Sequence, residues 1–147
     1  MSDGIDLKIT NLKAFNKKLN KTLQDNKVHA YVAKATRDVM NTAKESITKG
    51  GTGISYQKYS PRRTHTASAP NQPPASDTGF LVSQITMDVD VKTNGTVVGQ
   101  VISAAPYSAA LEFGTTQMTE RPFMQPALEK NRRKIEQLFR KGILKWV

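Results

Sequence analysis

Hydrophobic positions recur with a helical period in the first third of the chain. Before and after Asp25-Asn26, apolar side chains follow one another at intervals of three or four residues, and lysines fill the positions between them. This spacing puts the apolar side chains on one face of a helix. We expect one long amphipathic helix, or two in tandem with a kink at Asp25-Asn26, ending at Gly50-Gly51. The lysine-rich side is more typical of a solvated helix face than of a DNA-binding face.

Alternating apolar and polar residues, the period of a half-buried strand, occur at residues 5–9 and again at residues 85–92. Thr10-Asn11 follows the first alternation and predicts a helix N-cap. Asn94-Gly95 follows the second, and it is a strong hairpin signal because both residues tolerate a positive φ. The return strand, residues 96–102, has apolar residues on both faces, so we expect it to be deeply buried.

Prolines and glycines delimit two further helices. A short helix over residues 107–113 lies between Pro106 and Gly114. A final helix over about residues 125–145 has Pro126 in its first turn, where the missing amide has no helical partner. We therefore expect an α+β fold: a small antiparallel sheet with a central β-hairpin, covered on one face by the long N-terminal helix and the C-terminal helix. The expected domain is single and spans residues 1–147.

Residues 49–76 show no periodicity. They are rich in glycine, proline, serine and threonine, and none of them is acidic. Loops of this length within a compact domain are usually functional or disordered, so we expect a flexible basic loop between the first helix and the sheet. Lys58, Arg62 and Arg63, interleaved with tyrosines, are the candidate contacts to DNA or to a neighbouring subunit. In the isolated chain we expect a solvated loop, and in an assembly an ordered one.

Composition limits the classes of function. A formal net charge of +10 favours polyanions, with DNA first among them, or acidic protein partners to an equal degree. The absence of cysteine excludes disulfides and zinc–cysteine sites, and it fits assembly in a reducing host cytoplasm. The polar first ten residues predict no signal peptide, and no apolar run approaches the ~20 residues of a membrane span. We expect no membrane partner.

Candidate chemistry is sparse. The two histidines, His29 and His65, are far apart, and His65 has no carboxylate nearby in sequence, so no metal-ligand spacing is recognisable. Asp88 and Asp90 share one face of a predicted strand, which could suggest paired carboxylates but is more typical of the solvent face of a hairpin. We expect a protein that is not an enzyme and that has no cofactor and no metal site.

Three segments in order resemble the phage tail-component family, the small tail-completion or head–tail joining proteins of tailed bacteriophages. They are DTGFLVSQI at residues 77–85, PYSAALEFGT at residues 106–115 and RPFMQPAL at residues 121–128. Ser108 stands where the family usually has alanine, and Gln125 where a basic residue is frequent. The loop is also longer than is usual in the family.

The resemblance singles out residues that hold the fold or form a subunit interface: Asp77, Thr78, Gly79, Tyr107, Glu112, Phe113, Gly114, Arg121, Pro122, Phe123 and Pro126. Gly79 permits a turn before the strand. Arg121 is positioned to pair with Glu112. Phe123, between two prolines, is a rigid aromatic anchor for a pocket in its own core or in a neighbour.

The resemblance implies a structural virion subunit at the head–tail junction or at the head-proximal end of the tail. We expect a homo-oligomeric, six-fold ring that contacts the tail tube protein and the head connector or stopper proteins, with packaged DNA as a further contact. The alternative is a free-standing basic nucleic-acid-binding protein. The low aromatic content of 7% and the lack of a helix-turn-helix or stacking motif disfavour that alternative.

Overall fold

The computed structural model describes residues 27–144 of the 147. Its elements, in chain order, are α2 (Lys27–Thr48), β1 (Ser55–Tyr59), β2 (Arg62–Thr66), α3 (Phe80–Ser83), β3 (Ile85–Val91), β4 (Val97–Ser103), α4 (Ser108–Phe113) and α5 (Met124–Leu144). The strand expected at residues 5–9, the cap at Thr10-Asn11, the start of the long helix and the kink at Asp25-Asn26 lie outside the described residues.

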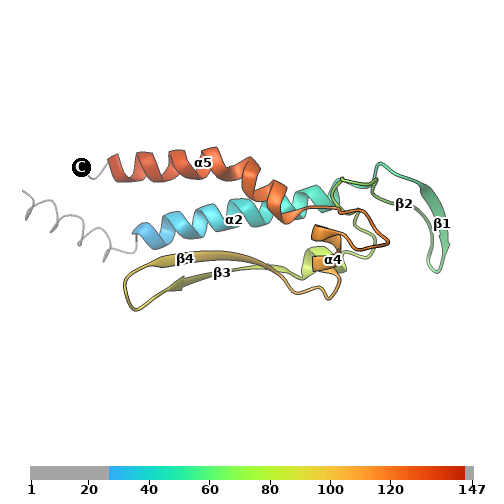
Figure 1. The fold of residues 1–147 in the computed structure, drawn as a ribbon, viewed down its shortest axis with the longest axis horizontal. Helices are drawn as coiled ribbons and strands as arrows, with labels where there is room; N and C mark the ends of the chain where they lie inside the picture. The colour runs from blue at the N-terminus through green and yellow to red at the C-terminus, as the bar shows by residue number, and fades with distance from the viewer. Residues whose placement is uncertain (1–26, 145–147) are drawn as a thin grey trace, which may run out of the picture.

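Helix α2 is the central layer of the fold, with α5 on one side and the β3–β4 hairpin on the other (Figure 1). Its apolar stripe is buried at Ala35, Val39, Ala43 and Ile47, as the helical period predicts. The expected α+β fold is confirmed. Within it, α2 lies directly on the hairpin and α5 packs on α2, because the stripe of α2 is wide enough to serve both neighbours.

The β3–β4 hairpin forms where the Asn-Gly signal predicts it. Gly95 has φ 81°, and the amide of Thr96 donates to the side-chain oxygen of Asn94 at 3.0 Å. The register pairs Ile85 with Ser103 and Val91 with Val97. The expectation of a deeply buried return strand is wrong: α2 covers only one face of the hairpin, so Ile102 on the other face of β4 is exposed.

Gly99 lets β4 lie against α2. A Cβ atom at this position would lie 2.0 Å from Oγ1 of Thr36 and 2.9 Å from Cγ1 of Val32. We expect Gly99→Ala to lower the free energy of unfolding by about 1–3 kcal/mol, the usual cost of overpacking. Denaturant unfolding checks this value. Adding Thr36→Ala removes the closest atom and should restore part of the loss, whereas an unchanged loss would contradict the steric explanation.

The main core lies where α3, α4 and the start of α5 meet the C-terminal half of α2. Phe123, Ile47 and Ile85 are its largest fully buried side chains. Leu81 and Ala127 join the same cluster. The core therefore joins segments that are far apart in sequence, and it fixes the positions of the short helices that carry the family-like motifs.

Residues 49–76, which the sequence predicts to be a flexible loop, contain an antiparallel hairpin, β1–β2. The prediction of a loop without secondary structure is therefore corrected. This hairpin, which we call the arm, projects past the ends of α2 and α5 at the far right of Figure 1. Its strands lack an apolar alternation because neither face of the arm packs into the core, so the hydrophobic pattern gave no signal. At its base the chain passes so close to Thr66 that a Cβ on Gly51 would lie 2.1 Å from the Thr66 carbonyl oxygen.

Candidate subunit interface

Asp77, the first residue of the DTG segment, holds the arm against the body of the protein. Its two carboxylate oxygens accept hydrogen bonds from Nζ of Lys58 and from the guanidinium of Arg63. Nδ1 of His65 lies 3.8 Å from one of these oxygens. Lys58, Arg63 and His65 all come from β1 and β2, so a single carboxylate lies next to most of the basic side chains of the arm.

The charge cluster lowers the pKa of the Asp77 carboxyl below its ordinary value of 3.8. The hydrogen bond from Lys58 is the largest cause, and the charges of Arg63, Lys58 and His65 act in the same direction against partial burial. A carboxyl with a lowered folded-state pKa stabilises the fold above its unfolded pKa, and it loses this effect as the pH falls through the folded value. We therefore expect the contribution of Asp77 to holding the arm to be present at neutral pH and to be lost in acid.

We expect Asp77→Asn to loosen the arm at neutral pH without unfolding the core. Hydrogen-exchange protection of residues 55–66, corrected for intrinsic rates, should fall in the variant at pH 7. In the unsubstituted protein it should fall only as the pH drops below about 4, the region of an unperturbed aspartate. Asp90→Asn is the matched control, since Asp90 is exposed on β3 and has no ion-pair partner among residues 27–144. Equal protection in both variants would contradict this role for Asp77.

The remainder of the DTG segment builds a turn. Gly79 has φ 81°, a conformation in which glycine carries no steric cost, as the sequence predicts. Oγ1 of Thr78 accepts a hydrogen bond from the amide of Phe80 at 3.3 Å. Tyr107, which opens the second motif, contacts Phe80 with ring centroids 6.3 Å apart. The first two motifs thus meet at the start of β3.

Glu112 caps the N-terminus of α5. Its Oε2 accepts from the amides of Phe123 and Met124 at 2.9 and 3.0 Å, and its Oε1 accepts from the amide of Gln125 at 2.8 Å. The next residue, Pro126, has no amide hydrogen to satisfy. The carboxylate and the proline together account for the amides that a helix N-terminus leaves unpaired. The second motif therefore supplies the carboxylate, and the third motif the amides, of one helix cap.

The expected pairing of Arg121 with Glu112 is wrong. The Arg121 guanidinium instead donates to the hydroxyl of Ser68, at the base of the arm, because the Glu112 carboxylate is occupied by backbone amides. The amide of Arg121 donates to the carbonyl of Leu111 at 2.7 Å. Gly114, with φ 72°, makes the tight turn after α4 that this arrangement requires.

Of the three phenylalanines in the motifs, Phe123 is in the core, whereas Phe80 and Phe113 are exposed. Phe123 is 1% exposed, so the pocket that it fills belongs to its own chain. Phe113 is 77% exposed at the end of α4. Pro122 is half-buried beside Phe123, and Pro126 is exposed. Most motif residues therefore hold the fold, and Phe113 is the one most available to a neighbour.

Phe113 lies at the edge of an apolar groove of about 640 Å³. The floor of the groove is α2, at Ala35 and Val39, and its walls are β4 and α5. Leu128, which is 51% exposed, lines the wall formed by α5. Leu128 lies near the start of α5, the last helix that the sequence predicts. Only the divergence of α5 from β4 leaves it facing an open groove.

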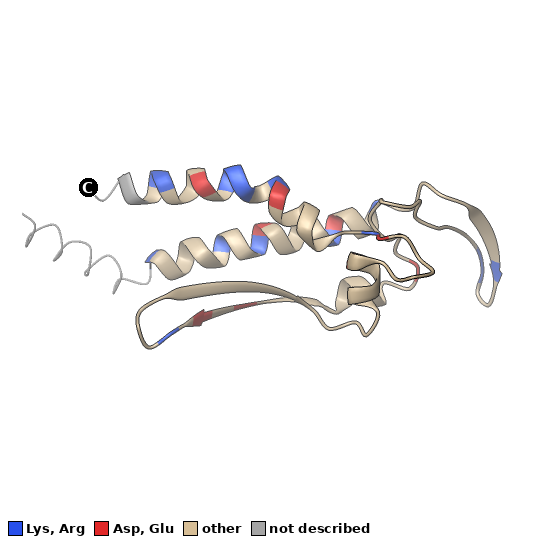
Figure 2. Cartoon of the chain, in the orientation of Figure 1, with Lys and Arg blue, Asp and Glu red and all other residues tan. Residues whose placement is uncertain are grey.

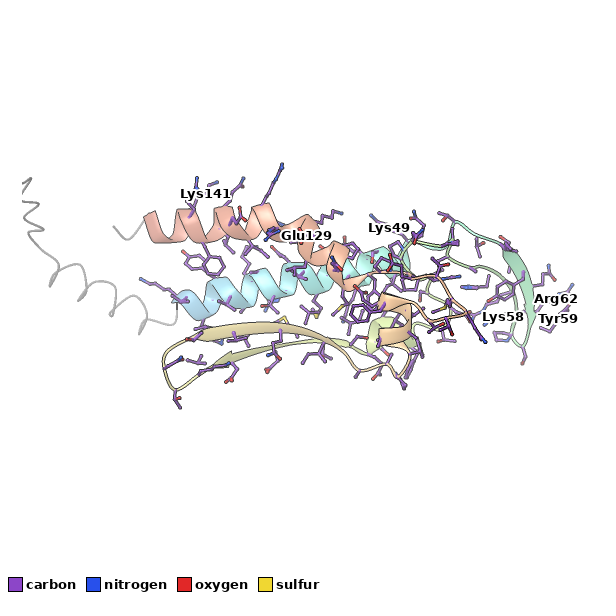
Figure 3. The ribbon with its side chains drawn as sticks, in the orientation of Figure 1. Lys49, Lys58, Tyr59, Arg62, Glu129 and Lys141 are labelled. Carbon is purple, nitrogen blue, oxygen red and sulfur yellow. The ribbon has the colours of Figure 1, made fainter. Side chains whose placement is uncertain are left out.

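The tip of the arm carries the second exposed surface. Tyr59 is 85% exposed, and Arg62, its cross-strand partner, is exposed beside it. Figure 3 shows both at the far end of the arm, well away from Glu129 on α5. Of the three basic candidates, Lys58 and Arg63 are bound to Asp77, so Arg62 is the one left for a partner. Tyr59 is one of the tyrosines that are interleaved with the basic residues of this segment, but an aperiodic segment gives no signal of its position in the fold.

The described residues offer no catalytic constellation. No group of three histidines, cysteines or carboxylates within the described chain is placed to hold a metal ion. Asp88 and Asp90 lie on the exposed outer face of β3, as expected for the solvent face of a hairpin. None of the helices between residues 27 and 144 is long and apolar enough to cross a membrane.

Comparison with known proteins agrees with the motif resemblance. Residues 13–114, well over half of the 147, match the family model described as bacteriophage HK97-gp10 tail component. No curated protein and no solved structure matches the chain. The matched region contains the arm, Asp77 and Glu112, and it ends at Gly114, just before the amides that Glu112 caps.

Proposed function

The chain belongs to the HK97-gp10 family of bacteriophage tail components, and from this premise we propose that it forms a six-fold ring at the head–tail junction or the head-proximal end of the tail. As a tail structural protein it is a part of the virion, and its role is geometric, without a catalytic step. The partners of the ring are the tail tube protein on one side and the head connector or stopper proteins on the other.

The observation that carries the proposal is that one chain exposes two unlike surfaces. The apolar groove lies between α5 and β4, and the projecting arm tip lies at the other end of the molecule. A ring that closes by rotation needs such a heterologous contact, in which one patch of a subunit meets a different patch of the next. The arm tip of one subunit occupies the groove of its neighbour.

The chemistry of the two surfaces supports this contact. Tyrosine and arginine are the residue types that contribute most to binding energy at interfaces, and Tyr59 and Arg62 form the arm tip. The groove offers Phe113 and Leu128 as exposed apolar contacts. An isolated two-stranded hairpin is marginally stable in water, so the arm gains stability when its tip is covered.

Cysteine cross-linking tests the contact, because the chain has no cysteine of its own. In a Tyr59→Cys, Leu128→Cys double variant, a short bismaleimide should link each subunit to the next. We expect a ladder of covalent species on a denaturing gel that ends at the hexamer. Each single variant should give no ladder, since a heterologous contact puts one thiol of each kind at every interface.

Tyr59→Cys combined with Asp90→Cys is the matched control, because Asp90 lies on the exposed face of β3, away from the groove. This pair should not produce a ladder. A ladder from the control and none from the Leu128 pair would overturn the arm-to-groove contact. A ladder that ends at another number would replace the six-fold ring.

Deletion of the gene in its phage tests the function itself. Electron microscopy of the lysate should show filled heads beside separate or abnormally long tails. Free tails of normal length indicate a joining role, and long tails indicate a terminating role. Normal infectious virions would overturn the proposed function.

A further inference from the structure

The exposed side of α5 is strongly basic. Its cations lie at spacings of three, four or seven residues, which places them on one helix face. They are Lys130, Arg133, Lys134, Arg140 and Lys141. Figure 2 shows this concentration of blue on α5. The groove-lining residues Leu128, Ile135 and Phe139 lie on another side of the same helix, so α5 separates an apolar surface from a basic one.

Most of these cations have no acidic partner within the described part of the chain. Among residues 27–144, only Lys134 of this face makes an ion pair, with Asp38 at 3.4 Å. The acidic residues of α5 do not compensate the others, because Glu129 and Glu136 pair with Arg132, at 3.5 and 4.0 Å. The basic face thus differs from the arm, where Lys58 and Arg63 are neutralised by Asp77.

We propose that this basic face of α5 contacts the phosphate backbone of duplex DNA. The inference rests on the proposed ring, in which the face lines the channel through which the genome passes. From Lys130 to Lys141 the helix rises by about 16 Å. One strand of DNA places a phosphate roughly every 3.4 Å, so the face spans about five phosphates. In this proposal the DNA contact lies on α5 and not on the arm, which carries Arg62 and Arg63.

Duplex DNA fits this surface better than an acidic protein does. A protein–protein interface needs apolar or aromatic side chains at its centre. The face from Lys130 to Lys141 has none among its cations, whereas Leu128, Ile135 and Phe139 line the groove and Ala127 lies in the core. Flexible cations without base-reading residues provide sequence-independent phosphate contacts, which suit DNA of any sequence moving through a channel.

The test compares two triple variants of the full chain that have the same net charge. In the first, Lys130, Arg133 and Arg140 are replaced by glutamine. In the second, Arg37, Lys49 and Lys92, which are exposed elsewhere, are replaced by glutamine. Fluorescence anisotropy with a duplex of arbitrary sequence gives the Kd at several salt concentrations.

We expect the first triple to raise the Kd at least tenfold at low salt and to reduce the slope of log Kd against log salt by about 0.9 for each charge removed. The second triple should retain most of the affinity and the slope. Equal losses in the two triples, or no DNA binding by the unsubstituted protein, would overturn the inference. Equal affinity for polyglutamate would assign the face to an acidic protein and would also overturn it.

Cross-linking of the same triple variants, each carrying Tyr59→Cys and Leu128→Cys in addition, separates this inference from the proposed function. A first triple that still forms the covalent ladder but has lost affinity for DNA supports both. A ladder with unchanged DNA affinity overturns only the role of α5. If the Tyr59→Cys, Leu128→Cys variant without the triple forms no ladder, the arm-to-groove ring is overturned, and the anisotropy comparison still decides whether α5 binds DNA.

Discussion

Replacing Phe123 by alanine is expected to lower the free energy of unfolding by about 3–5 kcal/mol, the range for a large aromatic side chain removed from a core. Phe123 is 1% exposed, and it belongs to the cluster formed by α2, α3 and α5. The loss combines the transfer free energy of the ring with the cavity that it leaves, since the surrounding helices collapse only in part. A loss of this size is a large fraction of the stability of an ordinary domain.

Phe113→Ala is the matched control, with the same residue type ten positions earlier in the chain. Phe113 is 77% exposed, so its removal should change the free energy of unfolding by less than about 0.5 kcal/mol. The same variant should weaken the cross-linked ladder, because Phe113 lines the groove. Urea unfolding of both variants gives the comparison. Equal destabilisation by the two would mean that the assignment of core and interface is wrong.

Glu112→Ala is expected to destabilise the protein by about 2–4 kcal/mol, since hydrogen bonds to a charged group are worth about 1.5–3 kcal/mol and unpaired buried amides add a penalty. Three amides at the start of α5 lose their acceptor together. The negative charge also lies at the positive end of the helix dipole, so its removal costs further stability. The effect should concentrate in the first turn of α5.

Denaturant unfolding measures the loss, and hydrogen exchange of residues 123–127 locates it. Glu112→Gln, which keeps one acceptor oxygen and the shape of the side chain, should lose less than the alanine variant. Glu136→Ala is the control, because Glu136 is exposed and, among residues 27–144, pairs only with Arg132 on its own helix. A Glu112→Ala variant as stable as this control would refute the capping role.

The three family-like segments hold separate parts of the fold together. Asp77 holds the arm, Glu112 holds the start of α5, and Arg121 ties the following loop to the base of the arm through Ser68. These contacts fix the direction in which the arm projects relative to the groove. Motifs that resemble a functional signature thus encode the geometry of an assembly subunit.

The local pattern determined those elements whose signal lies in neighbouring residues. The helical period of α2 predicted its buried stripe and its end near Gly50, because the spacing of apolar residues in an amphipathic helix reflects which of its faces is buried. Asn94-Gly95 predicted the β3–β4 hairpin through the tolerance of both residues for a positive φ. The motif resemblance predicted the family, which the match over residues 13–114 confirms. The single domain over residues 1–147 stays a prediction.

Tertiary structure decided what depends on residues far apart in the chain. The arm has no apolar period, and it is held by Asp77 from outside its own strands. The sequence does not assign Glu112 to the amides of α5, because a carboxylate in one motif and Arg121 in the next suggest an ion pair. Gly99 is required by a Thr36 side chain on another element. The spacing of apolar residues indicates which face of a segment is buried. Helix caps of this kind, close backbone approaches and grooves arise only when segments far apart in the sequence are packed together.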